Sequence, residues 1–190
     1  NHVDRSITDP IYFIKNNIIT STNLFYAYSR MINKNKIKFF HISTDEVYGS
    51  IKKGSFKEDN SYNPSSPYSA SKGSADLIAE SFNKTYNTNI KILNLTNNYG
   101  PYQFPEKFIP TLIFHFVKNK AATLYGSGKN FREWMHVSDS CEAIWRIMNL
   151  NKKFDRINRG TGKRDYHIEL SKIVCNWMQY KNVTKLINTK

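Results

Sequence analysis

Two groups of side chains in this sequence could perform acid–base chemistry. Tyr68 and Lys72 are four residues apart, so on a helix they would share a face, one turn from each other. A lysine cation held beside a tyrosine lowers the pKa of the phenol, which lets it act as a base near neutral pH. The tripeptide Thr44-Asp45-Glu46 brings a hydroxyl and two carboxyl groups, and two acids with different pKa values can remove one proton and deliver another.

The local sequence distinguishes the Tyr68/Lys72 pair from two others with the same spacing. Tyr-x-x-x-Lys occurs three times, at Tyr48/Lys52, Tyr68/Lys72 and Tyr125/Lys129. The first pair crosses a glycine in a predicted loop, and the third crosses two glycines. Tyr68 follows Ser66-Pro67, an N-cap and a first-turn proline, so we expect only this pair to lie on a helix.

Thr44-Asp45-Glu46 follows directly on the apolar run Ile37 to Ser43, which has the composition of a buried strand. In open α/β sheets the ligand crevice lies at the carboxyl ends of the strands. A catalytic role for the two acids is therefore one interpretation. The other is that Asp45 or Glu46 caps the turn after the strand, and the residues alone leave both open.

Hydrophobic periodicity supplies the elements that must position these residues. It predicts helices over about residues 14–32, 66–86, 109–117 and 138–149, and strands over 37–43, 90–95 and 134–137. Two successive βα-type units favour a parallel sheet with helices on its faces. We therefore predict an α/β fold with a doubly wound parallel sheet.

Composition excludes several classes of protein. The net charge is +13, from 28 basic and 15 acidic residues, but the lysines are spread along the chain. We read this as a compositional bias that suits an anionic small molecule, with no nucleic-acid partner. No apolar run could span a membrane, and no secretion signal is visible, so we expect a cytoplasmic protein. The two cysteines indicate neither a disulfide framework nor a metal site.

The glycine-containing loops do not bind phosphate by a known motif. Neither Gly128-Lys129 nor Gly162-Lys163 has the other residues of a Walker loop, and no G-x-G-x-x-G follows a strand. These residues therefore carry no dinucleotide fingerprint of their own.

Several longer motifs resemble one family. They are His-Val-Asp-Arg-Ser at 2–6, Ser-Thr-Asp-Glu-Val-Tyr-Gly at 43–49, Pro-Ser-Ser-Pro-Tyr-Ser-Ala-Ser-Lys at 64–72, Asn-Asn-Tyr-Gly-Pro-Tyr-Gln-Phe-Pro-Glu-Lys at 97–107 and Arg-Glu-Trp at 132–134. The sequence closely resembles the dTDP-glucose 4,6-dehydratase family, lyases of the extended short-chain dehydrogenase/reductase superfamily. Tyr-x-x-x-Lys marks the superfamily, and Thr-Asp-Glu with the Asn-Asn-Tyr-Gly-Pro run marks the dehydratases.

The resemblance implies a mechanism in deoxysugar biosynthesis with NAD as cofactor. Tyr68, assisted by Thr44 and Lys72, would deprotonate the glucose 4-hydroxyl while a hydride passes from C4 to NAD. Glu46 would remove the C5 proton and Asp45 would protonate the departing 6-hydroxyl. Return of the hydride to C6 gives dTDP-4-keto-6-deoxyglucose.

The resemblance also assigns binding residues. Tyr68, Lys72 and Asn97 would contact the cofactor. The nucleotide-sugar substrate would be bound by Thr44, Asn98, Lys107, Phe108, Thr123, Tyr125, Arg132 and His167, with Arg132 on the diphosphate. His167 stands where many members have an asparagine that contacts the nucleotide base.

The resemblance further implies two domains and a homodimer. Residues 1–98 would be the C-terminal part of a Rossmann-like NAD-binding domain. Residues 99–190 would be mostly a part of the smaller substrate-binding domain, with 131–150 returning to the Rossmann sheet. The family extends beyond both ends of this sequence, so we expect a truncated segment that is inactive alone, and a homodimer when full length.

Three alternatives stay open. The nearest is another nucleotide-sugar enzyme, a GDP- or UDP-sugar dehydratase or an epimerase, although an epimerase needs no acid/base pair for elimination. The second is a non-catalytic remnant that binds the nucleotide sugar without NAD. The most distant is a basic nucleic-acid-binding protein.

Overall fold

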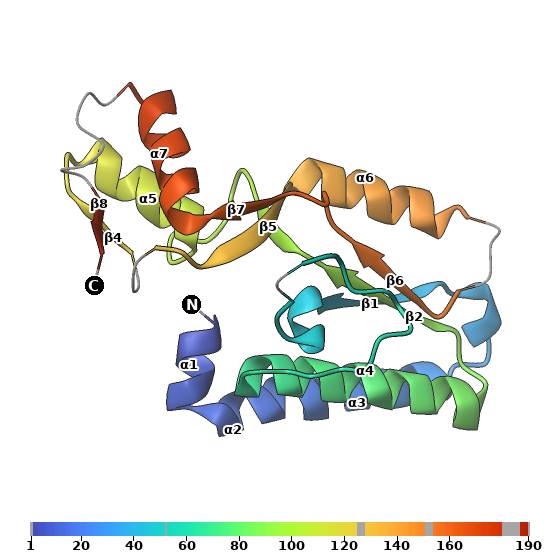
Figure 1. The fold of residues 1–190 in the computed structure, drawn as a ribbon. Coiled ribbons are helices and arrows are strands. Elements are labelled where there is room, and N and C mark those ends of the chain that lie inside the picture. The colour runs from blue at the N-terminus through green and yellow to red at the C-terminus, as the bar shows by residue number, and fades with distance from the viewer. Residues whose placement is uncertain (1, 52, 125–127, 151–153, 180–186, 190) are drawn as a thin grey trace. The chain divides into compact units, whose positions relative to one another are not determined.

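The chain forms two structural units. The computed structural model describes residues 2–51, 53–124, 128–150, 154–179 and 187–189 (Figure 1). The unit that we call the sheet unit comprises residues 2–96 and 140–159. The unit that we call the second unit comprises residues 97–139 and 160–190.

The sheet unit is built on three parallel strands. They are β1 (Phe39–Thr44), β2 (Ile90–Leu95) and β6 (Arg156–Arg159), in the order β1-β2-β6. Phe39 lies opposite Ile90 and Ile92 lies opposite Arg156 in the parallel register. The predicted α/β fold with a parallel sheet is therefore confirmed.

Helices make up most of the rest of this unit. They are α1 (His2–Thr8), α2 (Pro10–Phe13), the π-helical η1 (Ile14–Ile19), α3 (Thr20–Ser29), the 3₁₀ helices η2 (Lys34–Lys36) and η3 (Asp45–Tyr48), α4 (Pro67–Tyr86), and α6 (Val137–Met148), whose first three residues belong to the second unit. The helix predicted over 14–32 is thus a series of shorter elements that begins nearer the amino terminus.

Both faces of the three-stranded sheet are covered. On one face, buried Ile90 and Ile92 pack with Phe25 of α3 and Ala79 of α4. On the other, Leu93 and neighbouring apolar residues of the sheet pack against α6. Figure 1 shows α6 on one side of the strands and α3 with α4 on the other. This alternation of side chains along β2 is what a strand buried on both faces requires.

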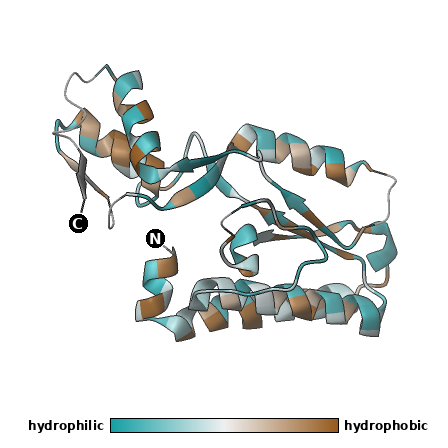
Figure 2. Ribbon diagram, in the orientation of Figure 1, coloured by the Kyte–Doolittle hydropathy of each residue, from teal (hydrophilic) through white to brown (hydrophobic). Residues whose placement is uncertain are grey.

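The second unit has its own sheets and core. β3 (Asn97–Tyr99), β5 (Phe131–His136) and β7 (Arg164–Tyr166) form one sheet, with β3 parallel and β7 antiparallel to β5. β4 (Ala122–Leu124) pairs in parallel with β8 (Ile187–Thr189). Helices α5 (Phe108–Val117) and α7 (His167–Trp177) share an apolar core with β4. Figure 2 shows hydrophobic residues along most of α5.

Two strands differ from the predicted ones because pairing between distant strands decides them. β3 is not among the predicted strands, and its partner is β5. β5 itself begins at Phe131, three residues before the predicted strand. The polar residues at these positions show no hydrophobic periodicity, so whether they form a strand depends on the partner strand.

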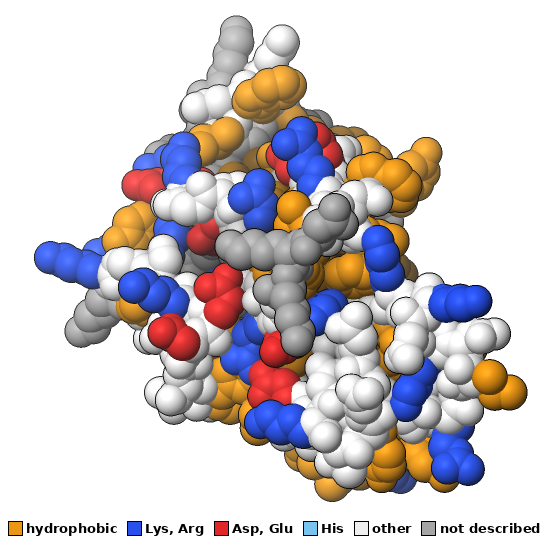
Figure 3. Space-filling model, turned by 90° about the vertical axis from the view of Figure 1, so that its right-hand side faces the viewer, with side chains coloured by type: hydrophobic (Ala, Val, Ile, Leu, Met, Phe, Trp, Pro, Cys, Tyr) orange, Lys and Arg blue, Asp and Glu red, His pale blue; other side chains and the backbone are white. Residues whose placement is uncertain are grey.

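The basic side chains are dispersed over the surface, in agreement with their spread along the sequence. Figure 3 shows Lys and Arg side chains in separate places on the face in view. Within the described residues, no helix has the length and hydropathy that crossing a bilayer requires. The same part of the chain contains no group of three His, Cys, Asp or Glu side chains placed to hold a metal ion.

Candidate active site

Helix α4 fixes the position of Tyr68 and Lys72. Ser66 is its N-cap, and Ser66 and Ser69 form a reciprocal capping box. Pro67 occupies the first helical position, where its missing N–H costs nothing. Tyr68 therefore lies in the first turn and Lys72 one turn later, as predicted from the sequence.

Lys72 connects this helix to the sheet. Its Nζ atom donates a hydrogen bond of 2.8 Å to the backbone oxygen of Ile42 in β1. Burial lowers the pKa of Lys72, and the charge of Asp76 raises it in part. The ammonium group thus lies two residues before the end of β1, where Thr44 stands.

Thr44 provides the cap for the turn that carries the two acids. It is the last residue of β1, and its side chain accepts a hydrogen bond of 3.3 Å from the backbone N–H of Glu46. Its hydroxyl also lies 3.3 Å from Oδ1 of Asp45, to which it donates. Because Thr44 caps η3, neither Asp45 nor Glu46 is needed for that purpose. The structural interpretation of the two acids loses its main support.

The acids and the phenol interact electrostatically. Burial raises the pKa of Tyr68 to about 12, and the negative charges of Glu46, Asp45 and Asp76 add to the rise. The charges of Asp45 and Glu46 both lie close enough to the phenol to affect its ionisation. A Tyr68 base therefore requires positive charge nearby to offset both effects.

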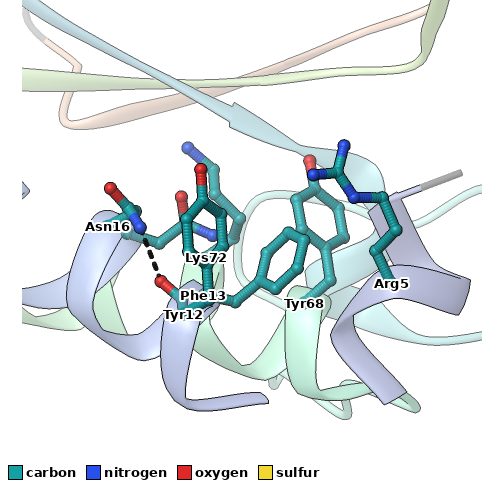
Figure 4. Close-up of a pocket in the computed structure, with 7 residues that line it drawn as sticks. Arg5, Tyr12, Phe13, Asn16, Tyr68 and Lys72 are labelled. Carbon is teal, nitrogen blue, oxygen red and sulfur yellow. Dashed lines mark hydrogen bonds between the residues drawn. The ribbon is translucent and has the colours of Figure 1, made fainter. Parts of the chain in front are cut away.

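A pocket of about 320 Å³ surrounds Tyr68 and Lys72 (Figure 4). Its other lining residues are Arg5, Tyr12, Phe13, Asn16 and Asn17. The rings of Phe13 and Tyr68 meet edge to face with centroids 6.0 Å apart, which fixes the phenol ring. Arg5 and Lys72 bring two cationic groups to the pocket that holds the phenol.

The sequence-based site did not include these five residues. Arg5 stands inside the His-Val-Asp-Arg-Ser motif, which was a usable signal, but nothing in the sequence placed it beside Tyr68. Asn17 donates a hydrogen bond of 2.9 Å to the hydroxyl of Ser71, so η1 is held against α4. This long-range contact brings the amino-terminal helices to the site.

The other predicted binding residues belong to the second unit. Asn97 and Asn98 lie in β3, and the side chain of Asn97 donates to the backbone oxygen of Glu133 at 3.4 Å. Lys107 is the N-cap residue of α5, and Arg132 lies in β5. Thr123 lies in β4, and Tyr125 is outside the described residues.

Three aromatic side chains in this unit form a stack. The rings of Phe108 and His167 are nearly parallel, with centroids 4.3 Å apart. Trp134 stacks on Phe108 at 5.8 Å and lies 6.1 Å from His167. Burial and the charge of Arg132 lower the pKa of His167 to about 4, so its ring is neutral at physiological pH. Trp134 was missing from the predicted set, although it ends the Arg-Glu-Trp motif.

The five predicted catalytic residues all belong to the sheet unit. All the predicted substrate residues except Thr44 belong to the second unit. In the sheet unit, Tyr68 and Lys72 share one pocket. Thr44 ends the strand that Lys72 contacts, and Asp45 and Glu46 follow it. The arrangement combines a candidate base, a cation and two candidate acids.

Comparisons with known proteins identify similar sequences and structures. The profile of a family described as GDP-mannose 4,6 dehydratase matches residues 1–184. A probable dTDP-glucose 4,6-dehydratase of Sinorhizobium fredii is 39% identical over 181 residues, covering 92% of this chain and 52% of that protein. The dTDP-glucose 4,6-dehydratase 1 of Escherichia coli is 38% identical over 191 residues, covering 92% of this chain and 53% of that protein.

A solved structure agrees over the whole chain. The dTDP-glucose 4,6-dehydratase of Streptomyces venezuelae, crystallised with NAD bound, superimposes with a TM-score of 0.92 at 34% identity. The match covers 100% of this chain and 57% of that protein. The chain spans about half the length of the curated relatives it matches.

Proposed function

Because this chain belongs to the GDP-mannose 4,6 dehydratase family, we propose that it is part of an NAD-dependent dehydratase that converts dTDP-glucose to dTDP-4-keto-6-deoxyglucose. The observation that carries the proposal is the placement of Thr44 at the end of strand β1, to which Lys72 is hydrogen-bonded, with Asp45 and Glu46 directly after it. For oxidation at C4, with NAD as the hydride acceptor, the side chains need to supply only a base such as Tyr68. The two acids are the additional groups that elimination of water requires.

In the first step Tyr68 removes the proton of the sugar 4-hydroxyl. Burial and the negative charges of the two acids favour the protonated form of the phenol. For Tyr68 to act as a base, the cations of Lys72 and Arg5, which line the same pocket, must favour its ionised form. The hydroxyl of Thr44, which donates to Asp45 in the structure, turns to donate to the oxygen of the same sugar hydroxyl and keeps it directed at the base. NAD, when bound, supplies the acceptor for the hydride that leaves C4 and the donor for the hydride that C6 later receives.

In the second step the two acids act on neighbouring carbons. The new 4-keto group makes the C5 proton acidic. Glu46 as a carboxylate removes it, and returns a proton to C5 when C6 receives the hydride. Asp45, in its protonated form, gives a proton to the departing 6-hydroxyl, which leaves as water. The hydroxyl of Thr44 donates to Asp45 and so supports the orientation of this side chain.

The residues around Tyr68 suit part of an NAD molecule. A pocket of about 320 Å³ is at the small end for ligand sites, enough for the nicotinamide ribose but not for the whole cofactor. Lys72 and Asn16 offer donors for ribose hydroxyls there. We propose that Tyr68 and Lys72 hold the ribose and that Asn97 of β3 contributes a further contact.

The second unit would bind the nucleotide sugar. Arg132 suits the diphosphate because a guanidinium presents paired donors to phosphate oxygens. The Phe108–His167 stack offers an aromatic surface for the nucleotide base. Asn98, Lys107, Thr123 and Tyr125 would complete the site, as the family resemblance implies.

The comparisons point to two different nucleotides for the substrate, GDP and dTDP. The name of the matching family profile favours a GDP-sugar, whereas the relatives of Sinorhizobium fredii and Escherichia coli act, by their names, on dTDP-glucose. His167 and Phe108 present a neutral aromatic surface that can stack on any base, so this surface does not distinguish the nucleotides. We choose dTDP because the sequence relatives are named for dTDP-glucose.

The test compares three substrates with one protein. The full-length natural protein and NAD are incubated with dTDP-glucose, UDP-glucose and GDP-mannose, and loss of one water is followed by mass spectrometry. The proposal expects dehydration of dTDP-glucose at the highest kcat/KM. Dehydration of GDP-mannose alone would reassign the substrate, and no dehydration of any of the three would reject the reaction.

We further propose that the full-length protein works as a cytoplasmic homodimer. Large apolar side chains on α3 and α4 are more than two fifths exposed, namely Leu24, Tyr26, Leu77 and Tyr86. Pairing these helices with those of a second copy would remove that surface from water. Light scattering should give twice the mass of one full-length chain, and a monomer at all concentrations would reject this arrangement.

A further inference from the structure

Asp76 is a fully buried carboxylate in the sheet unit, with 0% of its surface exposed. Its Oδ2 atom accepts hydrogen bonds from the hydroxyls of Ser43 and Tyr62, both at 2.7 Å, and from Nδ2 of Asn94 at 3.3 Å. Its Oδ1 atom lies 3.1 Å from Nε2 of His41, in contact but without hydrogen-bond geometry. The carboxylate is thus surrounded mostly by neutral donors.

These donors come from the elements that end at the candidate active site. Ser43 precedes Thr44 at the end of β1, and Asn94 occupies the neighbouring position of β2. Asn94 also donates a hydrogen bond of 3.1 Å to the backbone oxygen of Thr44. Asp76 therefore links helix α4 to the strand end that carries the two candidate acids.

Asp76 also lies on the face of α4 that carries the catalytic pair. Tyr68, Lys72 and Asp76 are spaced by four residues, so each is one helical turn from the next. The carboxylate acts on both: it raises the pKa of Lys72 against the effect of burial, and it contributes to the raised pKa of Tyr68.

Hydrogen bonding alone does not account for an aspartate at this position. An asparagine has the same shape and could accept from Ser43 and Tyr62. A carboxylate removed from water is costly unless its charge is compensated. His41 is the basic side chain in contact with the carboxylate, at 3.1 Å. The ammonium group of Lys72, one helical turn away and itself partly buried in the pocket wall, interacts with the carboxylate through space.

We propose that Asp76 is a positioning residue for the Tyr68–Lys72 pair, whose buried negative charge holds the Lys72 side chain in its charged form under the pocket. Asp76 does not touch the substrate in this scheme. It acts through Lys72, and it anchors α4 to β1 through Ser43. The inference rests on the proposed function of the pair, but its test requires neither substrate nor NAD.

Other charged and titratable side chains lie on the elements packed around Lys72, and the test must separate them from Asp76. They are Arg5 of α1, Tyr12 of α2, His41 of β1, Asp45 and Glu46 of η3, Tyr68 of α4 and Tyr62 of the preceding loop. Two of them, Asp45 and Glu46, are acids that could also hold a cation.

The first experiment measures the titration of Lys72 directly. Full-length protein is labelled with trace acetic anhydride at a series of pH values, and the peptide that contains Lys72 is quantified by mass spectrometry. In Asp76→Asn the labelling midpoint of Lys72 should move to lower pH by on the order of one unit. Lys91, paired with Asp155 in the same unit, is the internal control and should not move.

The conservative variant and folding are checked in parallel. Asp76→Glu keeps the charge and should keep the labelling midpoint of Lys72 near that of the unsubstituted protein. Circular dichroism establishes that each variant is folded. An unchanged midpoint in folded Asp76→Asn would overturn the proposal, whatever the outcome of the activity assays.

A second measurement needs no substitution, so it stands even if Asp76→Asn does not fold. Salt screens exposed charges strongly and buried pairs weakly. The midpoint of Lys72 in the unsubstituted protein should therefore stay nearly constant between low salt and about 1 M salt. A move to lower pH as large as that expected for Asp76→Asn would show that the partly exposed acids Asp45 and Glu46, and not Asp76, hold the lysine charged.

Discussion

Lys72 donates a hydrogen bond of 2.8 Å from its Nζ atom to the backbone oxygen of Ile42. This contact joins helix α4 to strand β1 just before the strand ends at Thr44. The candidate base and the candidate acids are therefore positioned by one packed unit, although more than 20 residues separate Glu46 from Tyr68. Substitution of the candidate base and substitution of the candidate acids should therefore affect different steps of the reaction.

Tyr68→Phe should abolish turnover without unfolding the protein. The phenyl ring keeps its edge-to-face contact with Phe13, but the proton acceptor is lost. Loss of a general base costs about 10²- to 10⁴-fold in rate. Steady-state assays with the full-length protein measure kcat, and Tyr102→Phe, at a fully exposed position, is the matched control. Turnover near that of the unsubstituted enzyme would remove Tyr68 from the mechanism.

The double variant Asp45→Asn, Glu46→Gln should separate oxidation from elimination. Neither amide can exchange a proton with the sugar. Tyr68 is retained, and loss of the two negative charges favours its ionised form. Reduction of the cofactor, followed by its absorbance, should therefore persist while exchange of the C5 proton with deuterated solvent stops. If exchange and product release continued at the normal rate, the two carboxylates would have only a structural role.

Ser66→Ala should destabilise the start of α4. It removes the acceptor for the backbone N–H of Ser69 and breaks the capping box. N-cap replacements of this kind lower the free energy of unfolding by about 1 kcal/mol. Urea denaturation measures the change, and Ser81→Ala within the same helix is the control. Equal stability of the two variants would mean that the cap contributes little.

His167 should make the stability of the protein depend on pH. Its folded-state pKa of about 4 is below the ordinary 6.5, so the unfolded chain binds the proton more readily. The stabilisation is complete above about pH 6.5 and is lost as the pH falls toward 4. We expect a loss on the order of 1 kcal/mol, reduced by the partial exposure of the ring.

Comparison of His167→Gln with the unsubstituted protein isolates this effect. The variant should show a smaller decline in Tm between pH 6.5 and 4 than the unsubstituted protein. His115→Gln, in helix α5 of the same unit, should retain the decline. Identical declines in the unsubstituted protein and His167→Gln would show that His167 is not the group responsible.

The sequence by itself determined the elements whose signals are local. Helix α4 begins where Ser66 and Pro67 predict it, because a cap and a first-turn proline act within one turn. Strand β2 has the predicted bounds, Ile90–Leu95, because an apolar run of strand length is bounded by polar residues on both sides. Tyr68 and Lys72 share a helix face for the same local reason.

Tertiary structure alone decided which residues meet. Arg5 reaches the pocket of Tyr68 through helices whose contact with α4 no local pattern specifies. Phe108 and His167 stack across almost sixty residues of chain, and Asp76 collects donors from two strands and a loop. Such contacts depend on long-range packing, in which the partner of a side chain is set by the whole fold and not by its neighbours in sequence.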